Sequence, residues 1–221
     1  MASNSSASVS AVPARPPLTR ARIVAAALAL IDRDGLGAFS VRGLGAALGC
    51  EPMSVYHYFP AKAHLQDALV DDALASIPTD PWDADPFDRL RALARSYRAL
   101  ARRHPKLYPL IAAHRLDTPA GVRFTEQALR LVHAAIPNDR LAAQYFRVLG
   151  YYLTGAALDE TAGNANGPLA AGRFEGPEWR ERAFELGLDS LLDAMRAASP
   201  AIGIPATEPL PAPKPVIRPK R

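Results

Sequence analysis

The sequence predicts an all-α protein that consists of an N-terminal three-helix unit of the helix-turn-helix type and a larger helical unit. Between residues 18 and 199, Ala and Leu dominate, whereas Val, Ile and Thr, which favour strands, are sparse. Apolar residues recur there three or four positions apart, which is the period of a helix face. We place the boundary between the two units at an Asp- and Pro-rich segment, TDPWDADP, residues 79–86.

Caps and stops place the helices of the first unit, residues 18–78. Thr19 and Ser40 are suitable N-caps, because a side-chain oxygen can accept a hydrogen bond from a free amide of the first turn. Gly35 and Gly49 can adopt the left-handed conformation that ends a helix, and Pro52 suits the first turn of one. We expect helices over residues 20–34 and 41–48, a short helix from 52, and a fourth from about 60 to 77.

The second unit, residues 79–199, is predicted to contain five helices. The periodic stretches lie at about 87–103, 105–115, 119–135, 139–160 and 177–198. Between the last two, residues 163–176 are rich in Gly and Asn, which predicts a mobile loop. Ten of the 21 prolines fall in residues 1–17 and 200–221, which lack apolar periodicity, so both ends are predicted to be disordered tails.

Composition excludes several classes of protein. With 221 residues, 49% of them hydrophobic and 22% charged, the chain is typical of a globular protein. No apolar run approaches the roughly 20 residues of a membrane-spanning helix, and the N-terminus, MASNSSASVS, lacks the features of a secretory signal. We therefore expect a cytoplasmic protein without a membrane partner. Cys50 is the single cysteine, so no internal disulfide or thiolate zinc site is expected, and no cofactor is predicted.

Two short helices joined by a glycine-containing turn form the candidate helix-turn-helix. Their apolar residues recur at inward spacings, at Val41, Leu44, Leu48, Val55 and Phe59. This leaves an accessible arc on the second helix, formed by Met53, Ser54, Tyr56, His57 and Tyr58. A helix of this size fits the major groove of DNA. From spacing alone, an ordinary helical hairpin with surface aromatic residues is the alternative.

The residues from Phe39 to Val70 resemble a known family. They read FSVRGLGAALGCEPMSVYHYFPAKAHLQDALV, which is similar to the DNA-binding region of the tetracycline-repressor (TetR) family. That region has a helix-turn-helix followed by Tyr-x-x-Phe and then a Lys, and Tyr56, Phe59 and Lys62 fill these places. The resemblance covers residues 18–77. Gly45 stands where the family usually has Ala, a difference that costs about 1 kcal/mol of helix propensity.

The resemblance implies how the first unit contacts DNA. Tyr56 and Lys62 are expected to contact phosphates and so to fix the position of the recognition helix. Arg42 is expected to reach a guanine edge or a phosphate, with a solvated helix arginine as the alternative. The expected base-reading residues are Pro52, Met53, Ser54 and His57. Tyr58 is also a candidate DNA contact, and packing inside the small unit is the alternative for it.

The second unit resembles the effector-binding and dimerisation domain of the tetracycline-repressor subgroup. The similar segments are RRHP at 102–105, His114 with Thr118-Pro119, Gly155 with Leu158-Asp159, and FELGLDSLLDAM at 184–195. In that subgroup, a His and a later acidic residue help to hold a drug–magnesium chelate, and the matching positions here are His114 and Asp159. We interpret His114 as a polar pocket or surface residue and predict no metal.

A ligand pocket is predicted inside the second unit, because aromatic residues recur on helices that must surround a common interior. The candidate lining residues are Tyr97, Leu100, Tyr108, Leu110, His114, Phe124, Tyr145, Leu149 and Tyr152. The alternative for each of them is a place in a packed helical core. A small, largely apolar effector is the expected ligand.

A homodimer is predicted from the last two helices. The helix at 139–160 is apolar almost all round, so its own domain cannot bury every face. The last helix offers an apolar face, Phe184, Leu188, Leu191 and Met195, and a small-residue face, Ala183, Gly187, Ser190 and Ala194. Two copies of each helix are expected to form a four-helix bundle across a two-fold axis.

Together these features predict a sequence-specific regulator that binds double-stranded DNA. We expect a repressor released from a palindromic operator by a small apolar effector. An activator of the same family and a non-specific architectural DNA-binding protein are the alternatives. Residues 1–64 and 200–221 each carry a net charge of +3, which suits a polyanionic partner. Motifs typical of hydrolases, phosphate loops and dinucleotide sites are absent, so the chain is not expected to be an enzyme.

Overall fold

The computed structural model describes residues 16–78, 85–161 and 177–199, and every regular element in these ranges is an α-helix. The all-α prediction is therefore confirmed. The elements are α1 (Arg20–Asp34), α2 (Val41–Leu48), α3 (Pro52–Tyr58), α4 (Lys62–Ala75), α5 (Pro86–Arg103), α6 (Tyr108–Ala113), α7 (Pro119–Ala135), α8 (Asp139–Thr161) and α9 (Pro177–Ala198). The two predicted tails from residue 15 back and from residue 200 on, most of the predicted boundary segment and the loop at 163–176 lie outside the described residues.

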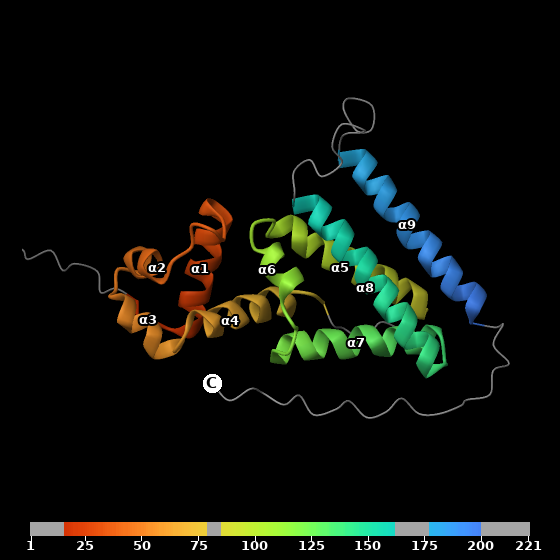
Figure 1. Cartoon of the computed structure of the whole chain (residues 1–221), viewed down its shortest axis with the longest axis horizontal. Helices are drawn as coiled ribbons and strands as arrows, with labels where there is room; N and C mark the ends of the chain where they lie inside the picture. The colour runs from red at the N-terminus through yellow and green to blue at the C-terminus, as the bar shows by residue number, and fades with distance from the viewer. Residues whose placement is uncertain (1–15, 79–84, 162–176, 200–221) are drawn as a thin grey trace, which may run out of the picture.

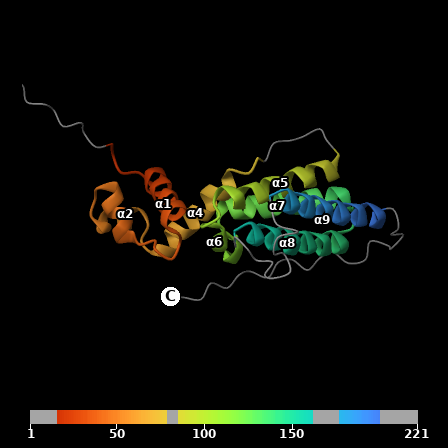
Figure 2. The same cartoon turned by 90° about the horizontal axis from the view of Figure 1, so that it is seen from above.

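The helices form a small bundle and a larger one, which lie end to end along the long axis of the molecule (Figures 1 and 2). Helices α1–α3 and the first part of α4 make the small bundle. Helix α4 continues toward the larger bundle, where it packs against α6 and α7. In the larger bundle α5, α7 and α8 pack against one another, and α9 lies along α5 and α8. Helix α4 thus belongs to both parts of the molecule.

Local sequence signals account for the ends of the first helices. The Thr19 side chain accepts a hydrogen bond from the Arg22 amide at the start of α1, and Ser40 accepts from Gly43 at the start of α2. Gly49 ends α2 in the left-handed conformation, with φ of 67°. The predicted caps are confirmed at these positions. The fourth helix begins at Lys62 rather than Pro60, because the backbone of Ala61 is extended.

Gly45 has a role in the turn between α2 and α3 that helix propensity does not reveal. A Cβ atom at this position would lie 2.8 Å from the backbone oxygen of Cys50, closer than Cβ atoms approach such an oxygen. The Cys50 amide also donates a hydrogen bond of 2.9 Å to the Gly45 oxygen. The missing side chain therefore lets the two helices of the helix-turn-helix approach closely.

Ion pairs join α5 to α9 along their length. Arg91 pairs with Asp189, Arg95 with Glu185, and Arg102 with Glu181. The two hydrogen bonds from the Arg95 guanidinium hold the pKa of the Glu185 carboxyl below its usual value. We call these pairs, together with Arg98 and its partners, the α5–α9 ion ladder.

Arg98 is the buried member of the ion ladder. Its guanidinium donates to Glu160 and to Glu181, and it lies 4.4 Å from the centre of the Phe184 ring. Only 6% of the Arg98 side chain is exposed.

The apolar face of α9 differs from the prediction at one position, since Leu192 is fully buried whereas Leu191 is half-buried. Within the described ranges, no helix combines the length and apolar character that crossing a membrane requires.

Candidate DNA-binding surface and ligand cavity

Helix α3 presents one buried and one exposed face. Val55 and the following Phe59 are each 1% exposed and anchor the helix in the small core. Met53, Tyr56 and His57 point to the surface, with 66% of Met53 exposed, while Pro52 and Ser54 are half-buried. This face of α3 is open along the length of the helix.

Two basic side chains flank α3 in the small bundle. Arg42 is exposed in the first turn of α2, and Lys62 is exposed at the first residue of α4. The Lys62 ammonium lies 6.0 Å from the centre of the Phe39 ring. Arg42, Tyr56, His57 and Lys62 are thus all exposed in the small bundle, and their side chains are of the kinds that contact DNA phosphates and bases.

Tyr58 lies apart from this set. Its hydroxyl donates a hydrogen bond of 2.6 Å to the Leu18 oxygen, and its own backbone oxygen accepts from the Arg20 guanidinium. That guanidinium also stacks 4.2 Å from the centre of the Phe59 ring. Tyr58 thus connects α3 to the start of α1. Arg20 was not predicted from the sequence to have a role, although two arginines, Arg20 and Arg22, stand at the start of α1.

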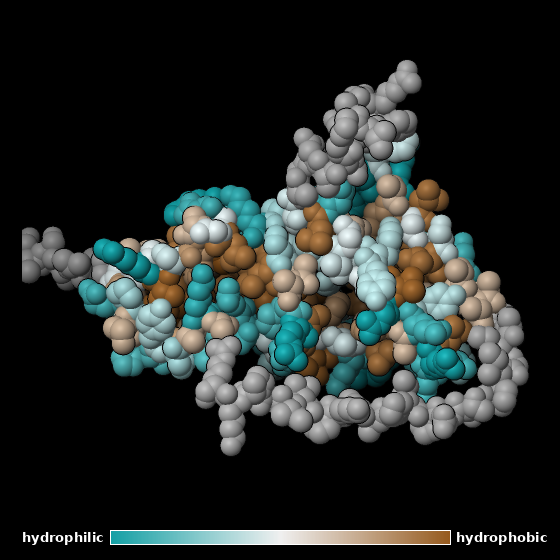
Figure 3. All heavy atoms as spheres, in the orientation of Figure 1, coloured by the Kyte–Doolittle hydropathy of each residue, from teal (hydrophilic) through white to brown (hydrophobic). Residues whose placement is uncertain are grey.

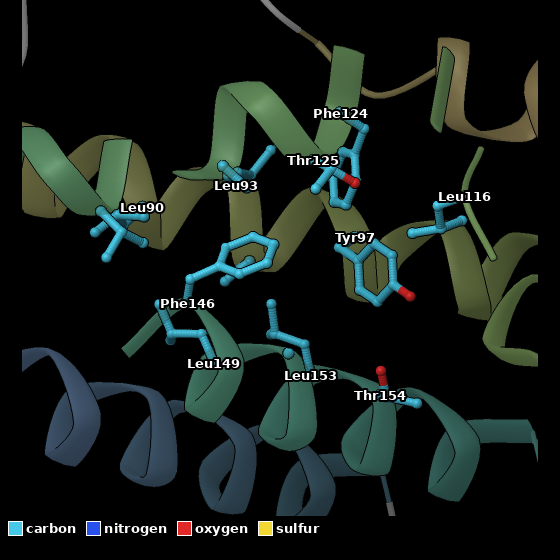
Figure 4. Close-up of a pocket in the computed structure, with 14 residues that line it drawn as sticks. Leu90, Leu93, Tyr97, Leu116, Phe124, Thr125, Phe146, Leu149, Leu153 and Thr154 are labelled. Carbon is cyan, nitrogen blue, oxygen red and sulfur yellow. The ribbon is translucent and has the colours of Figure 1, made fainter. Parts of the chain in front are cut away.

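A cavity of about 140 Å³ lies inside the larger bundle (Figure 4). Helix α5 contributes Leu90, Leu93, Ala94 and Tyr97. Helix α7 contributes Phe124, Thr125, Ala128 and Val132, and helix α8 contributes Phe146, Leu149, Gly150, Leu153 and Thr154. Leu116, from the turn between α6 and α7, completes the lining. The cavity is thus lined mainly by apolar side chains, with a few hydroxyl groups.

Among the candidate pocket residues, Tyr97, Phe124 and Leu149 line this cavity. Tyr108 is fully buried beside it and donates to the Tyr97 hydroxyl. The other candidates, Leu100, Leu110, His114, Tyr145 and Tyr152, are not among the residues that line it. The Tyr145 and Tyr152 hydroxyls instead donate to backbone oxygens of α9, at Ala194 and Phe184.

The cavity-lining residues that were not predicted from the sequence share a simple pattern. Leu90, Leu93, Ala94 and Tyr97 are spaced as one face of α5, and Phe146, Leu149, Leu153 and Thr154 as one face of α8. The predicted set combined aromatic residues with a few leucines and one histidine from several helices, rather than whole helix faces. A face chosen by its period would also have included Leu90, Leu93, Leu153 and Thr154.

The turn between α6 and α7 connects the cavity to α4. The Leu116 amide donates to Nδ1 of His114, so this nitrogen is the acceptor and Nε2 carries the hydrogen in the neutral ring. His114 Nε2 lies 3.1 Å from the Asp67 carboxylate of α4 and donates to it. His114 therefore contacts α4, with both ring nitrogens occupied.

The start of α7 is joined to α4 as well. Asp71 accepts a hydrogen bond of 2.5 Å from the Ala120 amide, in the first turn of α7. Leu116 has a φ of 55°, unusual for a residue with a branched side chain. A Cβ at Gly121 would lie 2.7 Å from the Leu116 oxygen, so this turn fits against α7 only because residue 121 has no side chain. Asp67 and Asp71 thus hold a tightly packed turn whose Leu116 side chain lines the cavity.

Sequence comparisons identify both parts of the chain. Residues 23–69 match the model of "Bacterial regulatory proteins, tetR family", and residues 78–173 match the "Tetracyclin repressor-like, C-terminal domain". The chain belongs to the TetR family. The resemblance seen in the sequence is confirmed, and this TetR-family chain is a member of a family of transcriptional regulators.

Individual TetR-family proteins are similar over most of the chain. The "HTH-type transcriptional repressor DrrR1" of Streptomyces coeruleorubidus is 32% identical over 148 residues, which are 66% of this chain and 55% of that protein. The chain thus spans little more than half the length of that relative. The class A tetracycline repressor protein of transposon 1721 from Escherichia coli is 26% identical over 201 residues, which are 78% of this chain and 88% of that protein.

A solved TetR-family structure has the same fold. The protein ActR of Streptomyces coelicolor, in its complex with actinorhodin, matches with a TM-score of 0.70 and 25% identity. The match covers 83% of this chain and 99% of the ActR chain.

Proposed function

We propose that this TetR-family chain is a transcriptional repressor that binds a palindromic DNA operator as a homodimer and is released from it by a small, largely apolar effector. The observation that carries this proposal is the connection of an apolar cavity to the helix-turn-helix unit through α4. The named activity of the relative DrrR1, a transcriptional repressor, and the ligand complex of ActR support it.

DNA binding through α3 is supported by the distribution of charge and exposure. Residues 1–64 carry six Lys and Arg against three Asp and Glu, and Arg42 and Lys62 are exposed in the bundle that contains α3. The long-range attraction of such cations to phosphates is independent of sequence. His57 and Met53 supply an imidazole and an apolar side chain that can distinguish base edges.

Selection of bound duplexes from a random library tests the DNA-binding part of the proposal. We expect a common palindromic site. Lys62→Ala should weaken binding to every duplex alike and lower the dependence of affinity on salt, because a phosphate contact is lost. His57→Ala should instead change the preference at one or two base pairs, by about 1–3 kcal/mol each.

Arg130→Ala is the control for these two variants, because this exposed arginine lies on α7, outside the small bundle. A loss of sequence preference in Lys62→Ala, or a uniform loss of affinity in His57→Ala, would contradict the assigned roles. If the affinity of the intact protein for DNA fell steeply with salt concentration while no common site was selected, the protein would be an architectural DNA-binding protein rather than a specific regulator.

Release by an effector follows from the contacts between the cavity and α4. A ligand that displaces Leu116 also displaces the turn that Asp67 and Asp71 hold. Movement of α4 changes the spacing between the two α3 helices of a dimer. Because the half-sites of a helix-turn-helix dimer lie about 34–36 Å apart or a multiple of that, a changed spacing prevents simultaneous binding of both.

Asp71→Ala is expected to separate effector binding from operator release. Effector affinity should change little, because Asp71 does not line the cavity, whereas the effector should lower operator affinity less than in the unmodified protein. A typical coupling of about 1–3 kcal/mol corresponds to a 5- to 150-fold change in affinity, and we expect most of it to be lost. Effectors are found by thermal-shift screening, and operator affinity is then measured with and without saturating effector.

Asp72→Ala supplies the matched control for this prediction. It removes the same charge from the neighbouring, exposed position of α4 and should leave the coupling intact. Unchanged coupling in Asp71→Ala would show that the start of α7 does not transmit the effector signal.

A further inference from the structure

We propose that the ligand of this cavity is a neutral molecule with a single aromatic ring and one hydroxyl or carbonyl group, such as a phenol. This inference rests on the proposed function, because it defines the chemical class of the effector for the same cavity. Four properties of the cavity support it: its volume, its shape, its hydroxyl groups and its lack of charge.

The volume limits the ligand to about one ring. The cavity measures about 140 Å³. An engineered cavity of about 150 Å³ in another protein, lined by Leu, Ile and Phe, stays dry and binds benzene. A ligand with three or four fused rings exceeds this volume, so part of it would lie outside the cavity unless the surrounding helices separated.

The shape of the cavity favours a flat ligand. The rings of Tyr97 and Phe124 are stacked with centroids 5.4 Å apart and an angle of 19° between their planes, so together they form an aromatic wall. Phe146 and Leu149 of α8 face this region from the other side (Figure 4). A planar ring between these surfaces buries both of its faces against apolar atoms.

Hydroxyl groups gather at one end of the cavity. Tyr108 donates a hydrogen bond of 3.1 Å to the Tyr97 hydroxyl, and Thr154 lines the cavity together with Tyr97. Burial raises the pKa of Tyr97 and of Tyr108, so both phenols are neutral and keep their protons. Because hydroxyl protons rotate, the cluster of Tyr97, Tyr108 and Thr154 can donate to a ligand oxygen or accept from a ligand hydroxyl.

No residue that the structure shows lining the cavity carries a charge at neutral pH. A carboxylate ligand would lose its hydration without gaining a cation, which is strongly unfavourable. His114 does not supply this cation, because its two ring nitrogens are hydrogen-bonded to the Asp67 carboxylate and to the Leu116 amide. A cationic ligand likewise finds no carboxylate in the lining. The cavity therefore selects a neutral molecule.

Calorimetric titration of the full-length protein with four probes tests this assignment. The probes are phenol, toluene, benzoate and 9,10-anthraquinone. Phenol is expected to bind about 3- to 10-fold more tightly than toluene, because it adds one hydrogen bond to the same ring. Benzoate is expected to bind at least 100-fold more weakly than phenol, and anthraquinone is also expected to bind more weakly than phenol.

Two hydroxyl-deletion variants locate the binding site. Tyr97→Phe and Thr154→Val should each reduce the preference for phenol over toluene while leaving toluene affinity nearly unchanged. The preference is the ratio of phenol affinity to toluene affinity in the same variant. A general loss of stability lowers both affinities and therefore leaves this ratio unchanged. Ala128→Leu, which adds atoms to the cavity lining, should weaken the binding of phenol and of toluene to a similar extent.

The outcomes distinguish this inference from the proposed function. Tighter binding of benzoate or anthraquinone than of phenol, or no binding of phenol or toluene, would overturn the assignment of ligand class. An unchanged preference for phenol in both hydroxyl-deletion variants would do the same. If phenol binds as expected but leaves operator affinity unaltered, the ligand class stands and the proposed release mechanism fails.

Discussion

Leu186→Asp is expected to turn the dimer into a monomer and to weaken operator binding by about 100- to 10,000-fold. Leu186 is 70% exposed on the outer face of α9, and Tyr151 is 67% exposed on the outer face of α8. Figure 3 shows hydrophobic residues at the surface over these two helices. An aspartate on this face would have to lose its hydration where two copies meet.

The size of the effect follows from the two half-sites of an operator. A dimer binds the second half-site as an intramolecular event, and linking two binding units raises affinity by about 10²–10⁴. A monomer loses this gain while its α3 surface stays intact. Sedimentation at micromolar concentration and operator titration measure the two consequences separately.

Leu129→Asp is the matched control for the dimer prediction. Leu129 is 38% exposed on α7, a helix that is not part of the predicted interface of α8 and α9, so this change should preserve the dimer. A Leu186→Asp protein that sediments as a dimer would show that the outer face of α9 is not part of the interface. The predicted four-helix bundle would then need another pair of surfaces.

Arg98→Leu is expected to lower the free energy of unfolding by about 3–5 kcal/mol. The substitution removes the cation from a buried pair and leaves Glu160, whose side chain is only 12% exposed, without its partner. It also removes the stacking of the guanidinium on Phe184. Chemical denaturation measures the loss.

Arg102→Leu is the control on the same helix, because Arg102 also pairs with Glu181. Its side chain is 53% exposed, and an exposed pair contributes about 0–1 kcal/mol. The double variant Arg98→Leu/Glu160→Leu should recover part of the stability, since no buried charge is then left unpaired. Equal losses in Arg98→Leu and Arg102→Leu would contradict the assignment of Arg98 as the buried centre of the ion ladder.

Features determined by neighbouring residues were predicted well from the sequence. Thr19, Ser40 and Gly49 act within one turn of their own helices, and each was placed correctly. The same holds for the inward face of the helix-turn-helix, where Leu44, Val55 and Phe59 are buried as expected.

Features determined by contacts between distant helices were predicted less completely. Tyr152 packs against α9 because Gly187 leaves room for its ring, and that ring would lie 2.6 Å from a Cβ at position 187. Helical period shows that Tyr152 is on an apolar face but does not show which helix covers it. The arginines of α5 likewise have carboxylate partners that lie more than 60 residues away in the chain, which local sequence patterns do not identify.

The cavity lining comes from α5, α7, α8 and the turn that contains Leu116, and none of the lining residues belongs to α3 or α9. Changes in ligand preference can therefore accumulate without altering the residues that read DNA or the outer face of α9. After a gene duplication, two copies of this protein could respond to different chemicals while still recognising one operator and still exchanging subunits. Mixed dimers of such paralogues would place a single gene under the control of two chemical signals.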